Sequence, residues 1–381
     1  GDLYYANGYL SVQDDYLDMI EPFASKFPYG VGLGNHEVDW PTHPPSMTYP
    51  PVYTGYESGG ECGVPSLRLY PVADTALDGV SWWSQDVGLF HVTTINTEVD
   101  FATGSPQWLW LERDLQQVDR HRTPWVVVSG HRPMYVDSNY ASDANGGDGD
   151  LNVMQKLIAE VEPLLLLYQV DVFWAGHNHA YQRHCTCAAG ECVDKPNLAN
   201  VYRDPEATLQ LVVGTGGADF TRNAQGADFA LNTLYMYGIG ILEAHNSTHL
   251  DYTFVDNGAN GGLRSSSRPG DVLDYATLVK PPPPPVSHSH HHKKSNALAK
   301  AFSSTTLQDA LIGIAVALVL LALLGFALYS YRYQLFAGSL ARGRDSDADS
   351  EHLSLAGDMS SPTDRRNPLL GGDTSDGTPL L

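Results

Sequence analysis

Short apolar runs alternate with polar segments that contain Gly and Pro along the first 279 residues. Two stretches have the period of an amphipathic helix, 105–120 and 152–167. The clearest of the other apolar runs end where a loop rich in Gly, His or Asn begins, and are predicted strands: 30–33, 87–95, 125–129, 170–175 and 209–213. Strands alternating with helices predict a layered α/β fold whose site loops follow the carboxyl ends of strands.

The pattern changes after residue 279. Residues 280–308 contain five consecutive prolines and a His-rich run, which together predict an extended stalk. Residues 310–331 carry no charge, and 22 helical residues span about 33 Å, enough to cross a hydrocarbon core of about 30 Å. We therefore expect a transmembrane helix over 309–331 rather than a buried core helix, and a disordered cytosolic tail over 332–381.

Two features favour a lumenal or extracellular position for residues 1–279. Arg332 directly follows the apolar run, and Asn246-Ser247-Thr248 is an acceptor sequence for N-glycosylation at Asn246. The tail ends in Leu380-Leu381 four residues after Asp376, the spacing of an acidic dileucine sorting signal that adaptors read. We expect a single-pass protein of the plasma membrane or of an endolysosomal or vacuolar membrane.

The net charge of the chain limits the classes of partner that it is expected to bind. The formal charge of −22 falls entirely within residues 1–279, since residues 280–381 carry nine basic and nine acidic side chains. A nucleic-acid partner is thereby disfavoured, because binding phosphate backbones requires clustered cations. With 43% apolar residues, the first part can bury a large core as one big domain or two small ones.

Four cysteines occur, and three of them lie within eight residues. In a protein of the secretory pathway this cluster predicts a disulfide rather than a metal site. We expect Cys192 to pair with Cys185 or Cys187 and to clip a small loop beside the site. Cys62 is then the candidate partner of the remaining cysteine.

Polar side chains with metal-binding atoms follow three of the apolar runs. They are joined by an Asp and a Tyr at the start of the chain, so the set comprises Asp2, Tyr5, Asn35, His36, His131, His177 and His179. Singly, each is more often a loop or surface residue. Together they supply the oxygen and nitrogen ligands suited to a pair of hard or borderline metal ions.

The same positions carry a family resemblance. GDxxY at 1–5, GNHE at 34–37, VxxH at 128–131 and GHxH at 176–179 resemble four of the five signature blocks of the purple acid phosphatases, over about residues 1–279. The resemblance implies a four-layer αββα sandwich, two mixed sheets flanked by helices, that hydrolyses phosphate monoesters by hydroxide attack. The cofactor would be Fe(III) with a divalent Fe, Zn or Mn ion, and the substrate a small phosphate ester.

The resemblance also assigns roles. Asp2 would bridge both ions, Tyr5 and His179 would bind the ferric ion, and His36 would contact the substrate phosphate. The divalent ion would be held by the remaining three, Asn35, His131 and His177. Phenolate is a good anionic ligand for a trivalent ion, so Tyr5 is the diagnostic residue.

This sequence departs from the family's pattern at two places. The first signature block, with one ferric ligand, is expected upstream of Gly1, and we therefore expect residues 1–381 alone to be inactive. Tyr140 and Ala141 stand where plant members carry a His pair. The resemblance therefore assigns no residue as the general acid, and His36 is the nearest candidate. The alternatives are a phosphodiesterase of the same superfamily, which would not use Tyr5, and a catalytically inactive membrane receptor or adhesion protein.

Overall fold

Parallel strands with buried apolar residues form the centre of the computed structural model, which describes residues 1–42, 47–70, 80–141, 149–259 and 268–284. The larger sheet has the order β1-β2-β3-β4-β8-β5-β6, with β9 paired to β5; β2, β3, β4 and β8 run parallel. Its strands are β1 (Trp83–Val87), β2 (Phe90–Thr94), β3 (Trp125–Ser129), β4 (Val172–Ala175), β5 (Tyr181–Ala188), β6 (Glu191–Asp194), β8 (Thr208–Val213) and β9 (Ala230–Leu234).

The smaller sheet has the order β10-β11-β12-β7 and is also mixed, because β12 and β7 are parallel while the other pairs are antiparallel. Its strands are β7 (Val201–Arg203), β10 (Gly238–Ala244), β11 (His249–Asp256) and β12 (Val272–Val279). The helices are α1 (Leu10–Ala24), α2 (Asn35–Val38), α3 (Val64–Leu69), α4 (Pro106–Gln117), α5 (Asp150–Glu160) and α6 (Glu162–Leu167).

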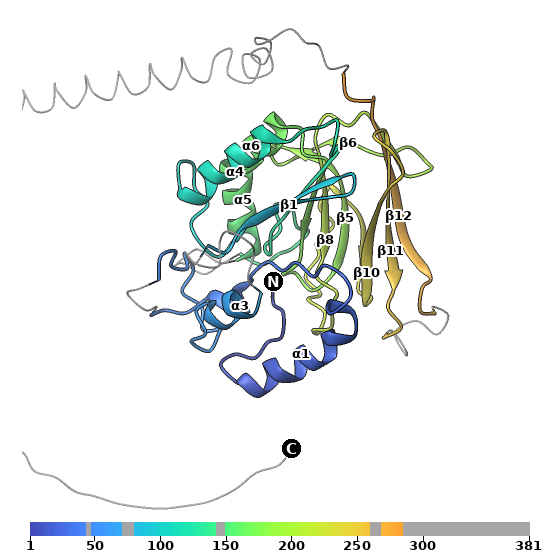
Figure 1. Cartoon of the computed structure of the whole chain (residues 1–381). Helices are drawn as coiled ribbons and strands as arrows, with labels where there is room; N and C mark the ends of the chain where they lie inside the picture. The colour runs from blue at the N-terminus through green and yellow to red at the C-terminus, as the bar shows by residue number, and fades with distance from the viewer. Residues whose placement is uncertain (43–46, 71–79, 142–148, 260–267, 285–381) are drawn as a thin grey trace, which may run out of the picture. The chain divides into compact units, whose positions relative to one another are not determined.

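The side chains of β3 alternate between the two faces of the larger sheet, and the core is divided into two layers. Val126 and Val128 pack with residues of α4, α5 and α6, whereas Trp125 and Val127 pack with Tyr252 and its neighbours between the two sheets. In Figure 1 these helices lie on one side of the larger sheet and β10, β11 and β12 on the other. A helix–sheet–sheet order follows from strands that are apolar on both faces.

The expectation of two mixed sheets is confirmed, but the described residues supply only three of the four expected layers. The outer face of the smaller sheet carries Ile239, Ile241 and Tyr275, which are about half exposed. Within the described ranges no helix covers this face. The fourth layer of the αββα prediction is therefore wrong for this part of the chain.

Several predicted elements differ from those observed. Residues 30–33 form no strand, and 87–95 divides at Gly88, where a turn joins β1 to β2. The predicted helix 152–167 is broken at Val161 into α5 and α6, because Pro163 lacks the N–H that a continuous helix needs. Strand β3 has the predicted bounds, and β4 and β8 lie close to theirs.

The cysteine cluster forms one disulfide, between Cys185 of β5 and Cys192 of β6. Cys62 and Cys187 are both buried and free, so the suggested second pairing is wrong. The bond does not clip a loop beside the site either. It closes the β5–β6 hairpin, six residues and roughly 20 Å of extended chain beyond His179.

The described part of the chain has no helix that is long and apolar enough to cross a membrane. The predicted transmembrane helix (309–331), the tail (332–381) and Leu380-Leu381 all lie outside the described residues, as does the stalk beyond residue 284.

A buried histidine links β2 to α4 and gives the fold a pH-dependent stability. Nδ1 of His91 lies 2.7 Å from Oδ1 of Asp86, and Nε2 lies 3.1 Å from Oδ2 of Asp114. Burial alone would lower the pKa of His91, but the bonds to Asp114 and Asp86 outweigh it and raise the pKa. The protonated form therefore stabilises the fold below the unfolded-state pKa of about 6.5, and this contribution is lost as pH rises through the folded-state pKa.

We expect His91→Gln to lower the free energy of unfolding by about 2 kcal/mol at pH 5 and by clearly less at pH 9, because only the protonated imidazole donates to both carboxylates. Urea denaturation at the two pH values measures the difference. His121→Gln, at an exposed position, is the control. An equal loss at both pH values would contradict the role given to the charge.

Candidate metal centre

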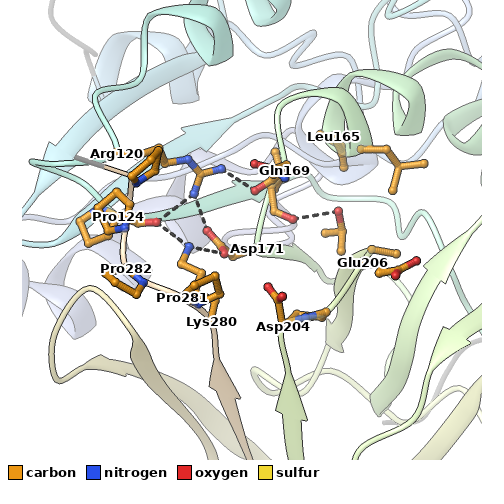
Figure 2. Close-up of a pocket in the computed structure, with 17 residues that line it drawn as sticks. Arg120, Pro124, Leu165, Gln169, Asp171, Asp204, Glu206, Lys280, Pro281 and Pro282 are labelled. Carbon is orange, nitrogen blue, oxygen red and sulfur yellow. Dashed lines mark hydrogen bonds and ion pairs between the residues drawn. The ribbon is translucent and has the colours of Figure 1, made fainter. Parts of the chain in front are cut away.

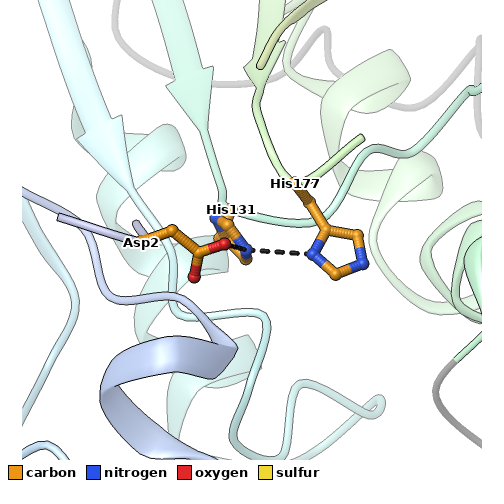
Figure 3. A group of neighbouring side chains, drawn as sticks. All are labelled: Asp2, His131 and His177. Atoms are coloured by element: carbon orange, nitrogen blue, oxygen red, sulfur yellow. Dashed lines mark hydrogen bonds and ion pairs between the residues drawn. The ribbon is translucent and has the colours of Figure 1, made fainter. Parts of the chain in front are cut away.

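Three loops and the start of the chain meet at one edge of the larger sheet. The parallel strands β3 and β4 end at Ser129 and Ala175, so the loops after them carry His131 and His177 to the same edge. Asn35 begins the short helix α2, and the segment that begins at Gly1 lies against it. Figure 3 shows Asp2, His131 and His177 turned toward one another from these separate segments.

Four ligand atoms converge at the position predicted for the divalent ion. Oδ1 of Asn35 lies 2.9 Å from Nε2 of His131 and 3.0 Å from Nδ1 of His177. The two ring nitrogens are 3.0 Å apart, and Oδ2 of Asp2 lies 3.2 Å from Nε2 of His131. Asp2, His131 and His177 each offer a ligand atom within 4.8 Å of the others. Lone pairs facing one another this closely fit a shared cation.

The residues predicted for the ferric ion lie on the other side of Asp2. The hydroxyl of Tyr5 is 3.2 Å from Oδ2 of Asp2 and 2.9 Å from Nε2 of His179. The same carboxylate oxygen of Asp2 therefore touches both groups of side chains. A carboxylate in this position would be able to bind an ion on each side.

The local backbone is strained where it presents these side chains. Asp2, Tyr5 and His177 all have positive φ, at 56°, 47° and 61°. Such conformations cost of order 1–3 kcal/mol each and persist when surrounding contacts hold them. Gly34 also permits close packing, since a Cβ there would lie 2.4 Å from Oδ1 of Asp2.

Glu37, the last residue of the GNHE motif, supplies the contacts that hold this arrangement. Its side chain is fully buried and accepts hydrogen bonds from the backbone N–H groups of Asp2 (2.7 Å), Leu3 (2.7 Å) and Gly34 (2.8 Å). One carboxylate thus joins the first segment of the chain to the loop that carries Asn35. Sequence reasoning quoted Glu37 in a motif but missed this role.

The electrostatics of the centre favour the ligand forms of Asp2 and His177 but not the phenolate form of Tyr5. Burial alone would raise the pKa of Asp2, but His131, and after it His177 and His36, lower the pKa well below its usual range. Burial, and after it Arg132, lowers the pKa of His177, so the imidazole is neutral. Burial and then Asp2 raise the pKa of Tyr5, so a nearby cation is needed to form the phenolate.

His36 lies beside the ligand atoms rather than among them. Its Nδ1 is 3.0 Å from Oδ1 of Asn7, and its ring centroid is 4.2 Å from that of Tyr5. Burial lowers the pKa of His36. The residue is half-buried, which suits the predicted contact with a substrate. Tyr140, which stands where plant members carry a His pair, is 49% exposed.

A cavity of about 250 Å³ lies at the opposite edge of the larger sheet, where β3, β4 and β8 begin. Figure 2 shows Arg120 and Lys280 converging on Asp171, with ion pairs of 2.7 and 2.5 Å. Lys280 also donates to the carbonyl oxygen of Pro124 at 2.6 Å. Asp171 thus compensates the charge of both cations at this cavity. The start of the proline run, Pro281 to Pro284, lines this cavity, at the edge away from the candidate metal centre.

Comparison with known proteins agrees with the motifs. Residues 1–181 match the family described as calcineurin-like phosphoesterase, and residues 207–265 match the family described as iron/zinc purple acid phosphatase-like protein C. The chain belongs to the purple acid phosphatase family. A solved purple acid phosphatase from yellow lupin seeds superposes with a TM-score of 0.62 at 29% identity, covering 76% of this chain and 49% of the lupin chain.

Two curated relatives of this chain carry different names. "Probable inactive purple acid phosphatase 9" of Arabidopsis thaliana is 38% identical over 229 residues, 58% of this chain and 33% of its own length. A "Nucleotide pyrophosphatase/phosphodiesterase" of Hordeum vulgare is 31% identical over 260 residues, 67% of this chain and 66% of its own. The chain spans between a third and about two fifths of the length of three of the Arabidopsis relatives that it matches.

Proposed function

We propose that this protein hydrolyses phosphate monoesters at a centre of Fe(III) and a divalent Fe, Zn or Mn ion. The observation that carries the proposal is the position of Asp2, whose Oδ2 lies 3.2 Å from both Nε2 of His131 and the hydroxyl of Tyr5. Asn35, His131 and His177 would hold the divalent ion, and Tyr5 and His179 the ferric ion. Such a pair of ions lowers the pKa of bound water and neutralises charge that develops on phosphorus oxygens.

Two further side chains, those of His36 and Glu37, would contact the substrate and position the ligands. His36, fixed through its Nδ1 by Oδ1 of Asn7, is left with Nε2 to contact the substrate phosphate. Half-buried beside Tyr5, it is the candidate proton donor to the leaving group. The buried carboxylate of Glu37 keeps Asp2 and Asn35 at their separation during turnover.

The full-length protein is the material for the test. We expect release of inorganic phosphate from p-nitrophenyl phosphate at acid pH, two metal ions per chain and a visible band from phenolate-to-iron charge transfer. Tyr5→Phe should abolish the band, since the phenolate is its source, whereas Tyr9→Phe, at an exposed position, should leave it unchanged. A metal-free, inactive wild type would instead support the receptor or adhesion alternative.

The name of the barley relative favours a second candidate reaction, hydrolysis of phosphodiesters. Bis(p-nitrophenyl) phosphate distinguishes the two, because a monoesterase leaves this diester intact. A kcat/KM at least 10-fold higher for the diester than for the monoester would replace the proposed reaction. The names "probable inactive" carried by several Arabidopsis relatives make activity itself the first measurement.

We further propose that residues 1–279 face a lumen or the cell exterior, anchored by residues 309–331. The uncharged run of 310–331 and the exposed Asn246 in the turn between β10 and β11 support this topology. Loss of mass on treatment with an N-glycosidase, absent in Asn246→Gln, would support it. An unmodified Asn246 in protein purified from its native membrane would count against it.

A further inference from the structure

The two ring nitrogens of His177 have different surroundings. Nδ1 faces the ligand atoms, 3.0 Å from both Oδ1 of Asn35 and Nε2 of His131. Nε2 points the other way, 3.4 Å from a terminal nitrogen of Arg132 and 3.5 Å from Oδ1 of Asp150. The groups on both sides influence which nitrogen carries the ring proton, and those on the far side differ in what they require.

Arg132 and Asp150 require opposite arrangements of that proton. A guanidinium only donates, so a hydrogen bond from Arg132 would need a bare Nε2 and would leave the proton on Nδ1. A carboxylate only accepts, so Asp150 requires the proton on Nε2. A neutral imidazole that offers Nδ1 to a cation must carry its proton on Nε2, and therefore only Asp150 is compatible with a metal at Nδ1.

Other carboxylates hold the guanidinium of Arg132. Its Nε lies 3.0 and 2.8 Å from the two carboxylate oxygens of Glu98, and one terminal nitrogen lies 3.1 Å from Oδ2 of Asp39. These bonds are shorter than the 3.4 Å contact to His177. The positive charge is thus compensated on the side away from the imidazole.

Asp150 is fixed in the orientation that serves His177. It is the first residue of α5 and only 4% exposed. Its Oδ2 accepts hydrogen bonds from Oγ of Ser138 (2.6 Å) and Nδ2 of Asn178 (2.9 Å), with Nδ2 of Asn223 at 3.4 Å. These donors occupy one oxygen, so Oδ1 remains directed at the imidazole.

We propose that Asp150 is a positioning residue that keeps the ring proton of His177 on Nε2 and so presents Nδ1 to the divalent ion. The inference rests on the proposed function, because it assigns a role toward the same ion. Carboxylates that orient a metal-binding histidine in this way typically change metal affinity by 10–100-fold when they are replaced.

The first test is zinc affinity of the full-length protein, measured with a competing chelator. We expect Asp150→Asn to bind Zn²⁺ 10–100-fold more weakly than wild type. Glu162→Gln is the matched control, since Glu162 is also a buried carboxylate, bonded to the hydroxyl of Tyr135 (2.6 Å) and the N–H of Ala189 (2.7 Å). It should lose stability but change zinc affinity less than 2-fold. Equal affinities of Asp150→Asn and wild type would overturn the proposal.

The second test needs no metal. In the metal-free protein with ¹⁵N-labelled histidine, the ring shifts of His177, assigned with His177→Gln, should report a proton on Nε2 in wild type and in Glu162→Gln. In Asp150→Asn they should report the Nδ1-protonated form or a mixture. A proton on Nδ1 in wild type would overturn the proposal. A wild type that binds no zinc yet keeps the proton on Nε2 would contradict the proposed function and the role of Asp150 toward a metal ion, and would support only its control of the ring proton.

Discussion

Replacing Asp2 by asparagine is expected to lower phosphatase activity of the full-length protein by at least about 1000-fold and to reduce bound metal from two ions per chain to one or none. The carboxylate is the only anion that touches both the Tyr5–His179 pair and the His131 side of the site within the described residues. An amide of the same shape carries no charge to offset two cations. Losing roughly 4 kcal/mol of transition-state stabilisation corresponds to this factor.

Metal analysis and kcat/KM for p-nitrophenyl phosphate check the prediction together. Asp18→Asn is the control, because Asp18 is exposed on α1 and its loss removes the same charge from the chain. It should retain activity and both ions. A variant Asp2→Asn that keeps two ions and more than a tenth of the activity would show that Asp2 does not bridge them.

The strands that position the site could be predicted because each is indicated by a short apolar run in the sequence. The apolar runs that became β3 and β4 end directly before His131 and His177, so the sequence itself indicates that both histidines reach one edge of a sheet. The convergence of Asp2 and Asn35 on the same point could not be derived from spacing. It followed only from the family resemblance, and the distances now show which atoms meet.

The residues that support the ligands could not be predicted, for a physical reason. Glu37, Asp150 and Arg132 are charged side chains that are almost fully buried, and a charged residue in a sequence is normally solvent-exposed. Their roles depend on partners that are distant in the chain. Leu3 lies 34 residues from Glu37, Glu98 lies 34 residues from Arg132, and Asn178 lies 28 residues from Asp150. The break between α5 and α6 has a different cause, since Pro163 is visible in the sequence but the apolar periodicity continues on both sides of it.

Glu37→Ala is expected to lower the free energy of unfolding by about 4 kcal/mol, the largest loss of stability that we expect from a single substitution in the site. The buried carboxylate is the acceptor for the N–H groups of Asp2, Leu3 and Gly34, and alanine leaves all three without it. An unsatisfied buried donor costs about 1–3 kcal/mol, and the vacated volume adds to the loss.

Metal affinity should fall with stability in this variant, because the bonds of Glu37 also fix the distance between Asp2 and the loop of Asn35. We expect Zn²⁺ to bind 10–100-fold more weakly, as for other contacts that orient ligands. Urea denaturation and zinc titration of the same preparation measure both quantities, with Glu21→Ala, at an exposed position of α1, as the control. A stable Glu37→Ala with unchanged zinc affinity would mean that the strained backbone at Asp2 is held by other contacts, and that the GNHE glutamate is dispensable for the centre.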